Sequence, residues 1–145
     1  MIVDHVGIAV KSIERGIELW ETVFGYKQIT EIVTNTRQKV KVVFLWKENS
    51  IDIKLISPSD EASPINAFIQ KGGGLHHLCF KCDSINRDIE RLKDMGMRVV
   101  TQPQPGEAFE NENIAFVFVK GLNIELIDTD KRAKLMDGAY REKQD

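Results

Sequence analysis

Four side chains of this sequence could form one reactive site. His5 and His77 each stand near the start of an apolar, strand-like run, and the two positions are 72 residues apart. Lys54 and Glu125 stand in a second pair of similar runs, Ile-Lys-Leu-Ile and Ile-Glu-Leu-Ile. Two imidazoles and one carboxylate suit a divalent metal ion that keeps open coordination positions. The competing interpretation is structural, because a single histidine at a strand start is more often a core or surface residue, and Glu125 could face solvent.

An internal repeat relates these positions in pairs. When the chain is aligned with itself at a shift of 72 residues, 5–18 falls on 77–90, and His, Ser, Ile, Arg, Ile and Glu recur at six of those fourteen positions. The apolar run 42–46 falls on 114–118, and after one residue of slippage 53–56 falls on 124–127. This self-similarity indicates a duplicated unit. His5 is then equivalent to His77, and Lys54 to Glu125.

Each half predicts the same order of elements, namely a strand, a helix and three further strands. Ser12 and Ser84 are placed to cap the two helices at their N-termini, and Gly25 and Gly96 follow the helices as C-terminal signals. Between the halves, the pair Ser63-Pro64 predicts the start of a linker helix. The strands are predicted at 2–10, 27–34, 38–47 and 51–57 and again at 75–82, 97–101, 112–119 and 122–128, with helices at about 12–24 and 84–95.

This order predicts an α+β fold of two tandem βαβββ modules that form a curved, eight-stranded mixed sheet around a central cavity. The expected organisation is a single domain over 1–130, with module 1 at about 1–58, the linker helix at about 63–71 and module 2 at about 74–128. The charged tail, 131–145, is interpreted as a short surface helix. In such a sheet His5, His77, Lys54 and Glu125 converge on the concave face. His76 should face the opposite side, because neighbouring strand residues alternate.

The composition is that of an ordinary globular protein. The chain has 145 residues, of which 42% are hydrophobic and 29% charged, with a formal net charge of −2. This balance argues against nucleic-acid binding, which needs a basic face. No secretory signal and no long apolar stretch is visible, so the cytoplasm is the expected location, with no membrane partner. Cys79 and Cys82 should point to opposite faces of one strand and stay reduced.

Several stretches of the sequence resemble the vicinal oxygen chelate superfamily. They are Asp4-His5-Val6-Gly7-Ile8-Ala9-Val10, Ser63-Pro64-Ile65 and Gly74-Leu75-His76-His77-Leu78. The order of Ser-Pro-Ile, Gly-Leu-His-His, Pro105-Gly106 and Ile124-Glu125-Leu126 is similar to methylmalonyl-CoA epimerases in particular. The resemblance covers residues 2–128.

The resemblance implies one divalent metal ion held by four strand positions. His5, His77 and Glu125 match three of the ligands, and the metal would be zinc, cobalt, nickel, manganese or iron. The fourth position is Lys54, and a protonated lysine has no lone pair to donate. If a metal binds, Lys54 is expected to point away or to be held by an anion, such as Asp52 on the same strand face or a substrate carboxylate.

The resemblance also implies a proton shift at the carbon next to a thioester carbonyl, through a metal-stabilised enolate. Glu125 matches one catalytic base of that reaction. The position of the second base is occupied by Arg37, which cannot act as a base at neutral pH. Arg37 and Lys54 together suggest substrate binding, either of a carboxylate or phosphate or of a developing oxyanion.

Three functions remain open at this point. The first is an epimerase-like enzyme acting on an acyl-CoA or another small carbonyl compound. The second is a glyoxalase-like or dioxygenase-like reaction at the same His, His and Glu site. The third is a metal-free, small-ligand-binding protein of the resistance type, in which Lys54 neutralises Glu125. The resemblance further implies a homodimer.

Overall fold

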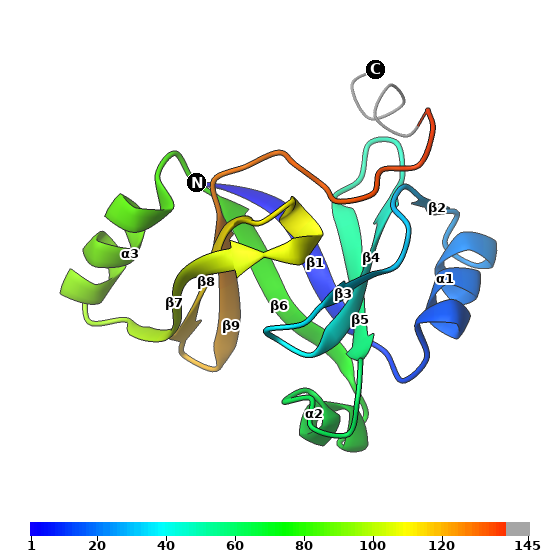
Figure 1. Cartoon of the computed structure of the whole chain (residues 1–145), viewed down its shortest axis with the longest axis horizontal. Coiled ribbons are helices and arrows are strands. Elements are labelled where there is room, and N and C mark those ends of the chain that lie inside the picture. The colour runs from blue at the N-terminus through cyan, green and yellow to red at the C-terminus, as the bar shows by residue number, and fades with distance from the viewer. Residues whose placement is uncertain (139–145) are drawn as a thin grey trace.

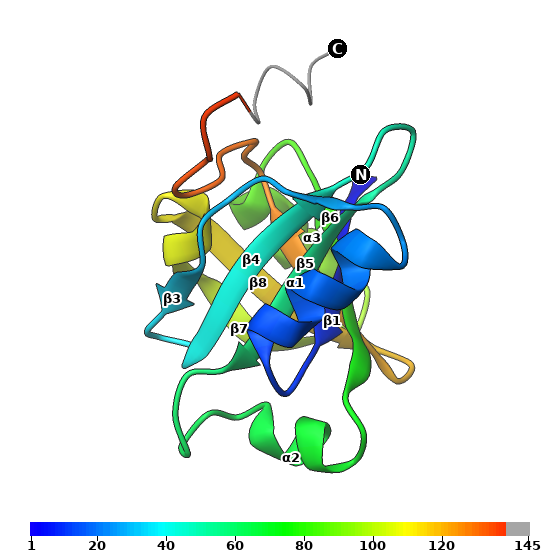
Figure 2. The same ribbon diagram turned by 90° about the vertical axis from the view of Figure 1, so that its right-hand side faces the viewer.

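The computed structural model describes residues 1–138. These residues form one curved sheet of nine strands, with helices α1 and α3 outside it and α2 at one end (Figures 1 and 2). The strand order is β2-β4-β5-β1-β6-β9-β8-β7, with β3 paired to β4. The elements are β1 (Ile2–Ala9), α1 (Ile13–Thr22), β2 (Lys27–Gln28), β3 (Val33–Asn35), β4 (Val40–Trp46), β5 (Asp52–Pro58), α2 (Asn66–Gln70), β6 (Gly74–Lys81), α3 (Ile85–Asp94), β7 (Arg98–Gly106), a 3-10 turn (Glu107–Phe109), β8 (Glu112–Val119) and β9 (Leu122–Ile127).

The predicted α+β fold of two βαβββ modules is confirmed. Each first strand pairs in parallel with the last strand of its own module, β1 with β5 and β6 with β9. The two modules meet where β1 runs antiparallel to β6. The sheet has nine strands rather than the predicted eight, because the segment expected as one strand over 27–34 is divided into β2 and β3.

Alternation along the strands separates a core on the concave face from two cores under the helices. On the outer face, α1 packs on β4 and β5 through Ile13 and Ile17, and α3 packs on β8 and β9 through Ile85 and Ile89. The predicted caps are confirmed, since Ser12 and Ser84 each accept a hydrogen bond from the backbone N–H three residues later. A concave-face core includes Phe44, Cys79 and Phe109.

Two predicted helix features are wrong. Ser63 does not cap α2, because the chain makes a turn at Pro64 and Ile65 before the helix begins at Asn66. The described part of the tail, up to residue 138, contains turns and an isolated bridge from Leu135 to Thr30 instead of a helix. Residues 139–145 lie outside the described structure. No helix among the described residues has both the length and the apolar character needed to span a bilayer.

Cys79 and Cys82 lie on opposite faces of the sheet, as predicted. Cys79 belongs to the concave-face core and Cys82 to the core beneath α3, and both thiols are free and buried.

Candidate functional site

The four predicted side chains meet on the concave face. They come from four neighbouring strands, Lys54 from β5, His5 from β1, His77 from β6 and Glu125 from β9, and each is buried. They converge because equivalent positions of the two modules face each other across the junction between β1 and β6. The pairing of His5 with His77 and of Lys54 with Glu125 in the repeat therefore becomes proximity in space.

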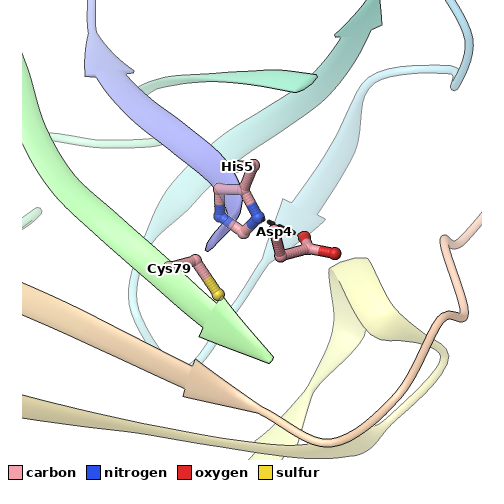
Figure 3. Close-up of side chains that lie close together, drawn as sticks. All are labelled: Asp4, His5 and Cys79. Atoms are coloured by element: carbon pink, nitrogen blue, oxygen red, sulfur yellow. Dashed lines mark hydrogen bonds and ion pairs between the residues drawn. The ribbon is translucent and has the colours of Figure 1, made fainter. Parts of the chain in front are cut away.

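A bulge in β1 places Asp4 beside His5. Val3 pairs with Phe80 and His5 with Cys79, so Asp4 is an extra residue in the ladder. Bulges re-aim side chains in this way. The Asp4 carboxylate accepts a 2.7 Å hydrogen bond from His5 Nδ1 (Figure 3), which directs His5 Nε2 toward Glu125. Burial opposes ionisation of Asp4, but bonds from His5 and Arg132 and their charge hold the pKa of its carboxyl well below the usual value.

Arg132 completes this side of the site and was missed by the sequence interpretation. Its guanidinium is buried, donates a 2.5 Å hydrogen bond to Asp4 Oδ2 and lies 3.6 Å from Asp52 Oδ2. It also stacks 4.2 Å from the centre of the Phe44 ring. The charged composition of the tail concealed this residue, because no periodic pattern marks one buried arginine in an irregular segment.

The equivalent bulge in β6 overturns the prediction for His76. Gly7 pairs with His77 and Ile8 with Leu75, so His76 is the extra residue. It does not face the opposite side of the sheet, because the bulge interrupts the alternation. His76 Nδ1 lies 2.8 Å from His77 Nδ1, and both rings line the same cavity. Burial and then the Lys54 charge lower the pKa of His76, which favours the neutral imidazole.

Glu125 contacts the other three side chains of the cluster. Its Oε1 lies 2.9 Å from His5 Nε2 and 3.2 Å from His77 Nε2, and Lys54 Nζ donates to both of its oxygens at 3.3 and 3.2 Å. Burial alone would raise the pKa of this carboxyl, but the ammonium and His5 outweigh it and hold the pKa well below its usual range. The His77 contact is close without hydrogen-bond geometry, so His77 Nε2 is a buried atom with no hydrogen-bond partner among the described residues.

A cavity of about 340 Å³ opens beside this cluster. Lys54, His76 and His77 are on its wall, whereas His5 and Glu125 lie behind them. Burial lowers the pKa of His77 to about 4, against the opposing effect of Glu125, so the ring is neutral near pH 7. The remaining wall is partly apolar and partly amide-bearing: Val40, Ile56, Ile65, Val100 and Phe116, with Gln38, Gln104 and Asn123.

Arg37 lies at the rim of this cavity, in the exposed turn between β3 and β4. Glu107 holds that turn, because its Oε1 accepts hydrogen bonds from the backbone N–H and the hydroxyl of Thr36. The structure therefore brings the predicted substrate-binding residues to one cavity, with Lys54 at its end and Arg37 at its mouth.

By donor type and spacing, His5, His77 and Glu125 could hold a metal ion, since their ligand atoms lie within 4.8 Å of one another. A carboxylate behind a metal-binding imidazole, such as Asp4 behind His5, is also usual. Lys54 is the contrary observation. Its ammonium is 2% exposed and is bound to both oxygens of the same carboxylate, so the set of four does not fit a divalent cation.

A second group, Asp4, His5 and Cys79, shares His5 with the first, and its three side chains lie close together (Figure 3). It does not suit a metal ion, because Arg132 already occupies the Asp4 carboxylate. Burial raises the pKa of the Cys79 thiol well above its usual value, so the thiol is protonated near pH 7.

Comparison with known proteins places the chain in a family. Residues 4–116 match the family model of the Glyoxalase/Bleomycin resistance protein/Dioxygenase superfamily. The chain belongs to this superfamily. It is 29% identical over 131 residues to the mitochondrial methylmalonyl-CoA epimerase of Dictyostelium discoideum, covering 89% of this chain and 77% of that protein. It is 28% identical over 130 residues to the ethylmalonyl-CoA/methylmalonyl-CoA epimerase of Cereibacter sphaeroides, covering 88% and 96%.

Solved structures give the same family. The methylmalonyl-CoA epimerase from Mycobacterium tuberculosis is 31% identical and superimposes with a TM-score of 0.78, covering 87% of this chain and 86% of that one. Relatives and structural neighbours thus support an epimerase-like function for this superfamily member.

Proposed function

We propose that this chain is an epimerase-like enzyme that moves a proton on the carbon next to the thioester carbonyl of an acyl-CoA. The acyl-CoA class is taken from the names of the relatives, which are epimerases of methylmalonyl-CoA and ethylmalonyl-CoA. The observation that carries the proposal is the end of the cavity, where Lys54 is held by a buried carboxylate beside two neutral imidazoles.

Removal of an α-proton places negative charge on the carbonyl oxygen, and a fixed cation stabilises that charge best in a site shielded from water. Lys54 suits this role. An ammonium has three N–H donors, and two of them are directed at the Glu125 oxygens. The third can donate to a substrate oxygen in the cavity. Because Glu125 anchors Nζ, the donor is positioned before the substrate arrives.

The proton acceptor that we propose is an imidazole on the cavity wall, either His76 or His77. Both rings reach the cavity, and a neutral imidazole has a nitrogen lone pair that can accept a proton. The sequence-based role of Glu125 as the base remains a prediction that the geometry does not favour, because this carboxylate is 0% exposed and lies behind Lys54. Its role here is to hold Lys54 and orient the histidines.

Arg37 at the mouth is proposed to bind an anionic group of the substrate, either a carboxylate or a phosphate of the CoA portion. The sequence-based prediction of zinc, cobalt, nickel, manganese or iron at His5, His77 and Glu125 remains to be tested by metal titration. A homodimer and a cytoplasmic location likewise remain predictions, and light scattering at high concentration tests the first.

The deciding experiment measures α-proton exchange from methylmalonyl-CoA and ethylmalonyl-CoA in deuterated water by NMR. The parent should exchange the proton, and Lys54→Met should lower the rate by at least about 100-fold through loss of the oxyanion donor. Lys120→Met, at the exposed turn between β8 and β9, is the matched control and should retain the parent rate. Equal rates for the parent and the Lys54 variant would refute the role of Lys54.

A metal-free binding protein is the second candidate, favoured by one observation. The Lys54–Glu125 pair closes the cavity and keeps the carboxylate away from any ligand. For this function an acyl-CoA would raise the melting temperature without any proton exchange. Glyoxalase-like and dioxygenase-like reactions also remain predictions, and oxygen uptake by the iron-loaded protein tests the latter.

A further inference from the structure

We propose that Lys54 is the resident cation of this site and that its ammonium replaces the divalent metal ion expected from the ligand set. The site would then be independent of metal. The binding part of this inference stands on the geometry alone, whereas its consequence for catalysis rests on the proposed function.

The contacts of Lys54 carry the first step. Lys54 extends from β5 and Glu125 from β9, the equivalent strand of the other module, so the two side chains approach from opposite sides of the junction. Nζ lies 3.3 Å from Oε1 and 3.2 Å from Oε2, which is a two-point, charge-assisted contact. Both oxygens of the sole carboxylate in the predicted ligand set are therefore occupied by one positive charge.

The position of a competing metal ion follows from these distances. An ion bound to Glu125 Oε1 would lie about 2.0–2.2 Å from that oxygen. Because Lys54 Nζ is 3.3 Å from the same oxygen, the ion and the ammonium would be at most about 5.5 Å apart. Their repulsion would act in a buried environment, where water screens poorly.

The surroundings retain Lys54 in this position. Its Nζ lies 5.1 Å from the centre of the Phe109 ring, a cation–π contact in the concave-face core. If the Lys54 side chain moved away to admit a metal ion, it would lose this ring contact and break its ion pair with Glu125. An ammonium cannot be removed by a chelator, so the site would keep its cation when metal ions are withdrawn.

Metal binding tests the inference directly. The purified parent, Lys54→Gln and Lys54→Glu are titrated with Zn²⁺, Co²⁺, Ni²⁺, Mn²⁺ and Fe²⁺ by calorimetry, with visible absorption for Co²⁺. The parent should bind none of them stoichiometrically. Lys54→Glu should bind one ion per chain at least about 100-fold more tightly, since it gains a ligand and loses a positive charge. Adding His77→Ala to Lys54→Glu should abolish that binding.

The opposite results would overturn the proposal. One ion per chain bound to the parent, and lost in His5→Gln, would show that Lys54 does not exclude the metal. Lys54→Glu binding no more tightly than the parent would place Lys54 away from the metal position. Circular dichroism checks that the variants fold. If they do not, the titration of the parent alone decides.

The catalytic consequence has its own measurement. Proton exchange by the parent should be unchanged after prolonged dialysis against a chelator. Loss of exchange on dialysis, restored by a metal, would refute metal independence. If the parent exchanges no proton under any condition, the proposed function fails, and the calorimetric result still decides whether Lys54 takes the place of the metal.

Discussion

The first strands of the two modules carry the same bulge, but they use it differently. In β1 the extra residue is Asp4, which is bonded to His5 and to the buried Arg132. In β6 the extra residue is His76, which contacts His77 on the cavity wall. The module 1 side is therefore closed by charge pairs, whereas the module 2 side is open to a ligand. The same bulge therefore presents a supporting carboxylate in module 1 and a cavity-lining imidazole in module 2.

The largest expected effect concerns a buried position at which the modules carry opposite charges, Lys54 in module 1 and Glu125 in module 2. Glu125→Ala leaves a buried ammonium without its partner and should lower the free energy of unfolding by about 3–5 kcal/mol, measured by urea denaturation. The control replaces both partners by apolar residues, as Lys54→Met with Glu125→Leu. It should recover most of that loss, because no buried charge is left unpaired. A loss below about 1 kcal/mol in the single variant would show that the pair is not buried in solution.

Gly7 marks the next difference, because its equivalent in module 2 is Cys79. A Cβ at Gly7 would lie 2.1 Å from His77 Cε1, so the ring could not keep its place. Gly7→Ala should cost about 1–3 kcal/mol and displace His77 from the cavity wall. Combining it with His77→Ala should remove most of the Gly7→Ala cost in a double-mutant cycle. If the two costs simply add, the ring does not lie over Gly7.

The comparison of Asp4 with His76 separates the two roles directly. His76→Gln should reduce proton exchange by about 100-fold if His76 is the base, with little change in stability. Asp4→Asn should instead lower the free energy of unfolding by about 1–3 kcal/mol through its bonds to His5 and Arg132, with a smaller effect on exchange. Exchange rates and urea midpoints of both variants check this, and the reverse assignment would overturn the comparison.

The smallest expected effect concerns a feature that the two modules share, the serine N-cap of the helix. Ser12 and Ser84 cap α1 and α3 with the same hydrogen bond to the residue three positions on. Each Ser→Ala change should cost about 1 kcal/mol, and the two costs should be similar. A large difference between them would mean that the duplicated elements contribute unequally to stability even outside the site.

Much of this site could be predicted from the repeat. His5, Lys54, His77 and Glu125 stand at paired positions, and pairing in a duplicated sheet predicts convergence. His76 and Arg132 could not be predicted in the same way. A bulge adds a residue to one strand of a ladder, and the alternation from which a face is predicted does not reveal where that happens. Arg132 lies in an irregular segment whose burial depends on contacts with Asp4, 128 residues earlier.

The sequence by itself determined the duplicated modules, the helix caps, the opposite faces of Cys79 and Cys82, and the meeting of four chemically active side chains. The modules and the meeting of the four side chains follow from the internal repeat, and the caps and the cysteine faces follow from local capping and strand periodicity. Only the tertiary structure decided which partner Lys54 takes. Its ammonium could have been held by Asp52 on its own strand face, but the Glu125 carboxylate stands 71 positions further along and accepts both hydrogen bonds. Lys54 and Glu125 meet because β1 and β6 pair between their strands, and the sequence separation of two residues does not reveal such a contact.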